Sequence, residues 1–250
     1  MNLHEFFIVC PLVFLAGFVD AIAGGGGLIS LPAYMFAGVP VHNAIATNKL
    51  SSATGTAVST WHLVKSRCVD LFLVPGTVAC AFVGSIAGAN LALIISDKVL
   101  KTVLVFVLPV VAFCVLRDKN LKPVIPEGFT RKKQYLIMAA CSFVIGIYDG
   151  FYGPGTGTFL ILILTGAARL DTRSASAQTK VINLSSNIAA LVTFIATGNV
   201  FYPLGLTAGV CSIAGHYIGA GMVAHNGKKV VRPVVLLVLA VLFVKIISGK

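Results

Sequence analysis

Two lysines lie inside segments that otherwise carry no charge, and each starts a stripe of polar residues. Lys49, Ser52 and Thr56 are spaced i, i+3 and i+7, so one face of a helix presents all three, and Asn48 adjoins them. A charge at the centre of a membrane helix costs about 2.5–3.5 kcal/mol on the insertion scale, so such a lysine needs a partner or a purpose.

The second half of the sequence repeats this stripe. Lys180, Asn183 and Asn187 keep the same spacing, and Gln178 precedes them. Two lysines that face a cavity would attract an anion and reject cations. The alternative is that each lysine reaches out to the lipid headgroups along its apolar stem.

Glycine-rich stretches interrupt the apolar sequence at two places. In lipid, an exposed backbone is tolerated only where protein or a water-filled cavity surrounds it. Where such a stretch leads into a helix, the free N–H groups and the helix dipole form an anion site, and two facing stretches could hold one small oxyanion. The alternative is a tight helix crossing that needs glycine; a nucleotide-binding loop is not expected, because the Gly-Lys-Ser/Thr ending is missing. The candidate residues are Gly24, Gly25, Gly26 and Gly27 in the first stretch and Gly153, Gly155, Thr156 and Gly157 in the second.

One aspartate precedes each glycine-rich stretch. Asp20 and Asp149 could form ion pairs with Lys49 and Lys180, hold protons for coupling, or cap the short helices that follow. All three interpretations remain open from the sequence.

The composition limits the class of protein. Hydrophobic residues make up 57% of the 250 residues and charged residues only 11%, whereas soluble domains average about 25% charged residues. A soluble enzyme and a disordered chain are therefore excluded, and an all-α, polytopic membrane protein with about eight transmembrane helices is predicted. The lipid bilayer is then the first partner of the chain.

Charge and motif content exclude further classes. The 19 Lys and Arg against 8 Asp and Glu mostly stand in short groups between apolar runs, which is typical of loops that face anionic headgroups, so no nucleic acid partner is expected. Neither a Ser/His/Asp set nor a metal-ligand spacing appears. We therefore expect no catalytic residue, no metal and no cofactor, and a protein that is not an enzyme.

The apolar runs predict the order of the helices. Short, re-entrant helices are expected after the glycines, near 28–38 and 157–167. Full crossings are predicted near 4–22, 42–63, 70–94, 99–116, 134–150, 173–197, 201–223 and 230–247.

The two halves of the sequence repeat each other. Residues recur first at a spacing of 129, as in Asp20 and Asp149, and then at 131, as in Lys49 and Lys180. We expect a first transmembrane repeat over 1–117, a charged linker over 118–134 and a second repeat over 135–250. Four crossings per repeat would make the halves parallel, whereas halves in which the short segments also cross would be inverted.

Duplicated halves with interrupted helices at matching places are typical of secondary transporters, whose sites lie where the repeats meet. The sequence therefore predicts a site for a small anionic substrate between the two broken segments and the two lysine-bearing helices. An anion channel and a non-transporting membrane scaffold or subunit are the alternatives.

These motifs resemble the TauE/SafE family of sulfite exporter-like transporters, also called TSUP, and especially its YfcA-like branch. The resemblance rests on FVDAIAGGGGLISLPAYMFAGVPVHNAIATNKL in the first half and on YDGFYGPGTGTFLILI and AQTKVINLSSNIAALV in the second. The second repeat departs from the first, because Pro154 lies among its glycines and Gln178-Thr179 replaces Thr47-Asn48.

The resemblance implies a multi-pass protein of the bacterial inner membrane that moves a small sulfur-containing or organic anion. It also implies coupling to the proton gradient. The substrate, the direction of transport and the choice between a monomer and a homo-oligomer stay open.

Overall fold

The computed structural model describes residues 3–96, 99 and 129–247, and in these ranges the chain is helical with no strand. The predicted crossing at 99–116 and most of the charged linker lie outside these ranges. The elements are α1 (Leu3–Ala23), α2 (Gly27–Phe36), α3 (Val41–Lys65), η1 (Leu71–Leu73), α4 (Val74–Ile94), α6 (Arg131–Phe151), α7 (Thr156–Gly166), α8 (Thr172–Ala196) and α9 (Tyr202–Ile247).

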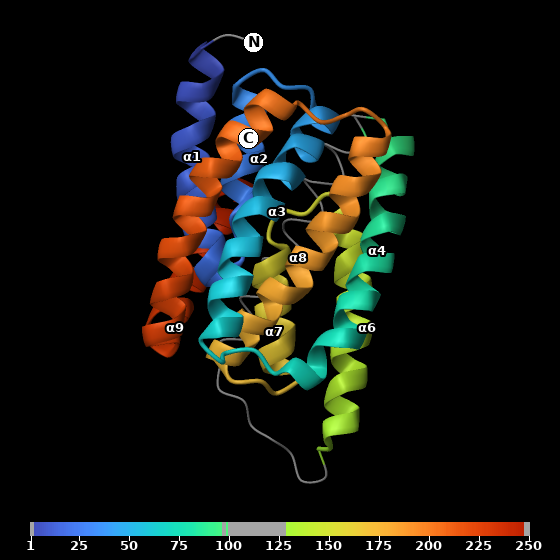
Figure 1. The fold of residues 1–250 in the computed structure, drawn as a ribbon, viewed down its shortest axis with the longest axis vertical. Helices are drawn as coiled ribbons and strands as arrows, with labels where there is room; N and C mark the ends of the chain where they lie inside the picture. Colours follow the sequence, from blue (N-terminus) through green and yellow to red (C-terminus); the bar gives the residue numbers. More distant parts are fainter. Residues whose placement is uncertain (1–2, 97–98, 100–128, 248–250) are drawn as a thin grey trace.

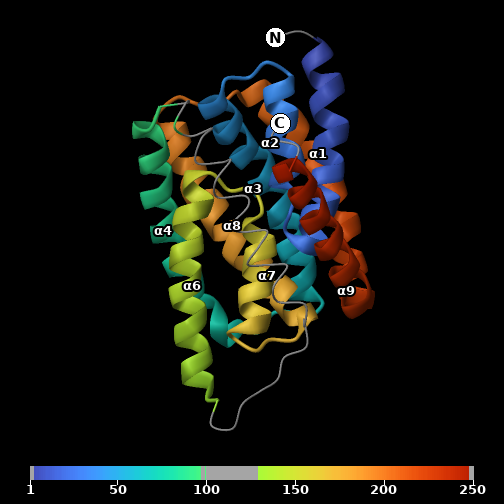
Figure 2. The same ribbon diagram turned by 180° about the vertical axis from the view of Figure 1, so that it is seen from behind.

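The structure confirms the predicted class of an all-α polytopic membrane protein. Five helical segments are long and apolar enough to cross a bilayer: Glu5–Ala23, Leu71–Ile94, Arg131–Phe151, Thr172–Ala196 and Tyr202–Asn226. α9 is interrupted at Asn226, whose φ of −133° and ψ of 32° are not helical. Beyond that residue the chain runs back alongside α1 and the first part of α9 (Figure 2), in agreement with the two crossings predicted for this region.

α3 and α8 form the centre of the bundle, between the pair α1 and α9 and the pair α4 and α6 (Figure 1). They run antiparallel, since Lys49 of α3 contacts Asn187 of α8 whereas Thr60, further along α3, contacts Lys180. α3 and α8 are equivalent in the sequence repeat. Their antiparallel arrangement therefore shows that the two halves are inverted with respect to each other.

The outer helices also pack in pairs that join the two halves. α1 runs parallel to α9, because Gly17 lies against Ser212 and Gly219 lies further along against Ala21. α4 in turn runs parallel to α6, with Gly146 against Ala81 and Gly150 against Ser85. Each half thus packs its first helix against the fourth helix of the other half, and the glycines allow the close approach.

The short helices α2 and α7 carry the chain back toward the end from which α1 and α6 started. α1 and α3 both run parallel to α9, so α2 must reverse direction between them (Figure 1). Its 10 residues span about 15 Å, roughly half of the hydrocarbon core. α2 and its counterpart α7 are the short helices that the sequence predicted near 28–38 and 157–167.

The inversion can be tested by labelling the loops that follow α3 and α8. Ser66 and Thr197 are equivalent residues at the ends of these antiparallel helices, so Ser66→Cys and Thr197→Cys should be reached from opposite sides of the membrane. In a cysteine-free background, a membrane-impermeant maleimide applied to sealed vesicles should label one variant, and the other only after permeabilisation. Labelling of both variants from the same side would contradict the inverted arrangement.

Candidate functional site

The two glycine-rich breaks touch each other at the centre of the molecule. A Cβ atom added to Gly24 would lie 2.2 Å from the backbone of Gly157, and Gly24 has a φ of +73°. The N–H of Thr158 donates to the carbonyl oxygen of Gly24 at 3.3 Å, and its hydroxyl donates to the carbonyl oxygen of Ala23 at 2.8 Å. The breaks are therefore joined backbone to backbone, and a side chain at Gly24 or Gly157 would separate them.

Buried ion pairs connect the halves crosswise around this contact. Lys49 of the first half lies 2.8 Å from the Oδ2 atom of Asp149 of the second half. Lys180 of the second half lies 2.8 Å from the Oδ2 atom of Asp20 of the first half. Lys49 and Lys180 are only 2% and 0% exposed, so neither lysine reaches toward the lipid headgroups.

Asp20 also caps the break that follows it. Its Oδ1 atom accepts a hydrogen bond from the N–H of Gly26, the residue before α2. Its Oδ2 atom contacts Lys180 and, at 3.2 Å, Nε2 of His216. Pairing and capping, two of the roles that the sequence left open, therefore occur together at this carboxylate.

A chain of polar groups holds the Lys49 ammonium in place. Its Nζ atom donates to the Oδ1 atom of Asn187 at 3.0 Å, and the amide nitrogen of Asn187 donates to Asn183 at 3.1 Å. On the other side, the hydroxyl of Ser186 donates to Asp149 at 2.6 Å. The polar face of α8 and the end of α6 thereby fix the ammonium between the two halves.

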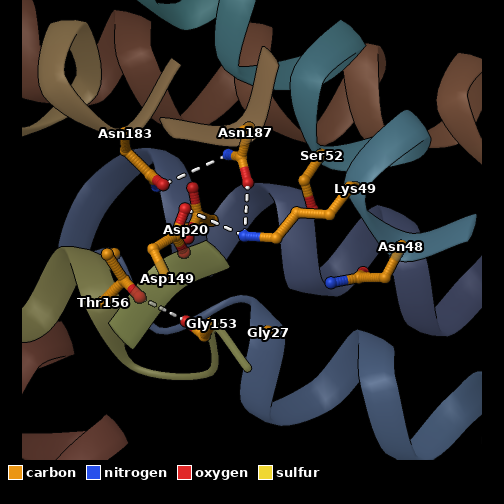
Figure 3. Close-up of a pocket in the computed structure, with 11 residues that line it drawn as sticks. Asp20, Gly27, Asn48, Lys49, Ser52, Asp149, Gly153, Thr156, Asn183 and Asn187 are labelled. Atoms are coloured by element: carbon orange, nitrogen blue, oxygen red, sulfur yellow. Dashed lines mark hydrogen bonds and ion pairs between the residues drawn. The ribbon is translucent and has the colours of Figure 1, made fainter. Parts of the chain in front are cut away.

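These groups line a small central cavity of about 20 Å³, which is room for about one water molecule. Figure 3 shows the Lys49 ammonium in the middle of the group, with the amide nitrogen of Asn48 turned inward from α3. The Oδ1 atom of Asn48 is buried and has no hydrogen-bond partner among the described residues. The lining residues are Asp20, Gly24, Gly27, Asn48, Lys49, Ser52, Asp149, Gly153, Thr156, Asn183 and Asn187.

Seven of the predicted site residues lie outside the lining. Lys180 sits behind Asp20, and Gly26 borders a neighbouring cavity. Thr56 is buried in α3 with an unpaired hydroxyl, and Gln178 donates its amide to the carbonyl oxygen of Asp70 at 2.7 Å. The remaining three are Gly25, Gly155 and Gly157.

Several backbone N–H groups of the breaks are engaged inside the protein. Gly24 donates to the carbonyl oxygen of Asp20, Gly153 to that of Tyr148 and Thr156 to that of Gly153. These groups would have to release their present acceptors before they could bind an anion.

Three residues at the ion pairs were not predicted as site residues from the sequence. His216 of α9 contacts Asp20, and Ser186 of α8 contacts Asp149. Ser85 of α4 donates to the carbonyl oxygen of Ser186 at 2.6 Å. The repeat contains the signal that would have found them, because a spacing of 131 aligns Ser85 with His216 and Gly55 with Ser186.

In the part of the chain that the structure describes, no group of three or more His, Cys, Asp or Glu side chains is placed to hold a metal ion. The site offers two ammonium groups, two carboxylates, amides and hydroxyls, a set suited to binding a small polar ion.

Comparisons with known proteins agree with this architecture. The family described as "Sulfite exporter TauE/SafE" matches residues 9–246. A "Probable membrane transporter protein YfcA" from Escherichia coli (strain K12) is 34% identical, with 98% of this chain and 93% of that protein covered. A "Probable membrane transporter protein ORF9" from Sinorhizobium sp is 32% identical over 94% of this chain and 89% of its own.

A further relative is a "Probable membrane transporter protein" from Haemophilus influenzae, 32% identical over 95% of this chain and 92% of its own. No solved structure matches the chain significantly.

The contact between the breaks predicts an unequal effect of two glycine substitutions. Gly24→Ala introduces two unfavourable effects: the strain of a positive φ and an overlap of the new Cβ atom with the backbone of Gly157. Gly198→Ala introduces the strain alone, because Gly198 has a φ of +71° and an added Cβ atom there would meet nothing within 4 Å. Gly24→Ala should cost about 1–3 kcal/mol more than Gly198→Ala. Denaturation of the purified variants in detergent measures this difference, and equal losses would mean that the breaks do not pack as described.

Proposed function

The chain belongs to the sulfite exporter TauE/SafE family of membrane transporters, and we propose that it carries a small oxyanion, sulfur-containing or organic, across the bacterial inner membrane. It does so as a secondary transporter whose substrate binds at the central cavity. The two halves that move against each other are residues 1–117 and 135–250, joined by the linker 118–134.

The observation that carries this proposal is the position of the Lys49 ammonium. It lines the cavity at the contact of the two breaks, and Lys180 does not. Directional groups accompany it, namely the amides of Asn48, Asn183 and Asn187. A fixed cation with amide donors around it suits an oxyanion, because charge-assisted hydrogen bonds to anionic oxygens are about twice as strong as neutral ones.

The charges of the site determine how an anion can enter. Lys49 and Lys180 balance Asp20 and Asp149, so the two ion pairs together are neutral. An anion that binds Lys49 competes with the carboxylate of Asp149 and adds one negative charge to a buried site. The free-energy cost of that charge is high, because burial penalises an uncompensated ion.

A proton removes this cost. Protonation of one group in the network restores neutrality when the anion binds, so proton and anion would enter together. The groups in question are the carboxylates of Asp20 and Asp149 together with the side chains in contact with them, and this mechanism would give the coupling to the proton gradient that the family resemblance implies.

The size of the cavity means that the site must open for a substrate. With about 20 Å³ it has room for a water molecule but not for a polyatomic oxyanion. Inverted halves supply two equivalent ways of opening, because a rearrangement of one half toward one side has a counterpart in the other half toward the opposite side. The present conformation then corresponds to a closed state between the two.

The anion channel remains the competing function, since it would use the same residues without coupling. A non-transporting scaffold is less well supported, because it gives no reason for two lysines buried at the contact of the halves. A homo-oligomer is compatible with either function.

Binding can be measured before transport is known. Sulfite should raise the midpoint of thermal unfolding of the purified protein above that in sodium chloride of equal ionic strength, because a ligand that binds the native state stabilises it. Loss of the ammonium should weaken sulfite binding about tenfold or more, since a hydrogen bond to a charged group contributes about 1.5–3 kcal/mol. Methanesulfonate in a parallel series tests the sulfonate class.

The variant for this test is the double substitution Lys49→Met with Asp149→Asn. It removes both charges, whereas either substitution alone leaves a buried unpaired ion at a cost of about 3–5 kcal/mol. Lys65→Met is the matched control, because Lys65 is an exposed lysine at the end of the same helix, over the ring of Trp61. Equal stabilisation by sulfite of the double variant and the control would remove Lys49 from the binding site.

Coupling distinguishes the transporter from the channel. In proteoliposomes with an imposed pH difference, radiolabelled sulfite should accumulate against its own gradient, and a protonophore should abolish the accumulation. The double variant should show neither uphill nor downhill movement above empty liposomes. Movement that is only ever downhill in the wild type would establish the channel instead.

A further inference from the structure

We propose that His216 and Asp20 form a binding site for one proton, the coupling ion of the transporter, and that this site exists beside Asp20 and not beside its repeat counterpart Asp149. The coupling role rests on the proposed function, whereas the presence of the proton does not.

The imidazole of His216 occupies a space that two glycines keep open for it. A Cβ atom at Gly55 of α3 would lie 2.3 Å from its Nδ1 atom, and one at Gly17 of α1 would lie 2.8 Å from the same atom. His216 is only 2% exposed. The ring is therefore held between α1, α3 and α9 with little freedom to turn.

Both ring nitrogens face hydrogen-bond acceptors. Nδ1 lies 2.9 Å from the carbonyl oxygen of Ser212, which can only accept, and 3.2 Å from the Ser212 hydroxyl, which can also donate. Nε2 lies 3.2 Å from Oδ2 of Asp20, and an ionised carboxylate cannot donate. A neutral ring donates from one nitrogen only, whereas a ring with one further proton donates to the carbonyl oxygen and to the carboxylate together.

The neighbouring cation places that proton on the ring. Lys180 lies 2.8 Å from the same Oδ2 atom and stabilises the ionised form of the carboxylate. The N–H of Gly26 donates to its Oδ1 atom and acts in the same direction. The carboxylate thus remains an acceptor, and the further proton is held by the ring of His216.

Few other groups act on this site. The charged groups that the structure brings to it are Asp20 from α1 and Lys180 from α8. α9 contributes the hydroxyl of Ser212, 3.2 Å from Nδ1. α2 and α3 contribute Ser30 and Ser52 to the surrounding cavity, and neither is charged.

A second small cavity lies beside the central one. It has a volume of about 10 Å³ and is bordered by His216, Ser212 and Ser30. The residues Asp20, Gly27 and Ser52 border both cavities. The carboxylate of Asp20 therefore lies between the imidazole and the proposed anion site.

The contact around Asp149, the repeat counterpart of Asp20, has a serine in place of this histidine. The residue that corresponds to His216 is Ser85, and it donates to the carbonyl oxygen of Ser186, the counterpart of Gly55. The hydroxyl of Ser186 then donates to Asp149. This carboxylate has a neutral donor where Asp20 has a titratable one, so the site beside Asp20 can take up a further proton in a way that the contact at Asp149 does not offer.

The extra proton gives the site the charge that an anion needs. Lys49, Lys180 and a protonated His216 supply three positive charges against the two negative charges of Asp20 and Asp149, which leaves one positive charge in excess. One monovalent anion neutralises this excess. We therefore infer that one proton accompanies each monovalent anion and that His216 carries it.

Nitrogen-15 NMR of the ring tests the site directly. Protein labelled with ¹⁵N-histidine in lipid nanodiscs at pH 7 should give one imidazole with both nitrogens protonated, and His216→Gln should remove that signal. His225→Gln is the matched control, because His225 is an exposed histidine of the same helix that bonds only the carbonyl oxygen of Gly221 among the described residues. A His216 ring with a single protonated nitrogen at pH 7 in the wild type would overturn the proposal.

The coupling role has its own measurement in the same proteoliposomes. With sulfite as the probe and an enclosed pH-sensitive dye, the wild type and His225→Gln should move one proton per hydrogen sulfite anion equivalent. His216→Gln should lose this stoichiometric proton movement by at least tenfold, and it should bind sulfite more weakly than the wild type in the thermal-shift assay. If His216→Gln leaves the number of protons moved per sulfite unchanged, the coupling role is refuted. If the wild type moves no sulfite at all, the proposed function is refuted, and the NMR result alone decides whether the proton site exists.

Discussion

The cost of burying charge in a bilayer governs the centre of this protein. Four ionised side chains lie at the middle of the bundle, and each lysine is paired with an aspartate of the other half. Because an unpaired buried ion is strongly destabilising, neither half can keep its charges in place without its partner. The ion pairs therefore hold the two halves to each other at the centre of the bundle.

The glycine-rich breaks make this pairing geometrically possible. α1 and α6 end at the breaks, so Asp20 and Asp149 lie at the helix ends that lead into the point where the halves touch. Gly24 and Gly157 bring the two backbones into direct contact. A bulkier contact would push the aspartates away from the lysines, so the backbone packing and the ion pairs depend on each other.

Local features of the site could be predicted from the sequence, and relations between the helices could not. The polar stripe that starts at Lys49 follows from helical periodicity, and α3 presents it to the centre. The short helices α2 and α7 follow from the glycines. In contrast, the choice between parallel and inverted halves depended on whether α2 reverses the chain, and apolar length alone does not determine that.

Crosswise pairing could not be derived for a similar reason. The spacing of Lys49 and Asp149 along the chain says nothing about which helices face each other, so each lysine could equally have paired within its own half. Gln178 shows the opposite error, because its position in the motif suggested the site whereas its side chain binds the backbone of Asp70. Register between distant helices is set by packing, and here the glycines of α4, α6 and α9 set it.

The departure from symmetry at His216 bears on how the proton gradient could drive transport by this protein. Two identical inverted halves would meet the two sides of the membrane with the same chemistry, and a proton would find equivalent groups on either side. In the sequence repeat, His216 corresponds to Ser85 and Gly55 corresponds to Ser186. A histidine therefore lies beside the carboxylate of Asp20, whereas a serine lies beside that of Asp149. A proton taken up there charges the contact at Asp20 and not the contact at Asp149, so the energy of the two open states differs by the interaction of that charge with the anion. Under the proposed mechanism, the sequence difference at this one repeated position turns an almost symmetric passage into one that responds to the proton gradient.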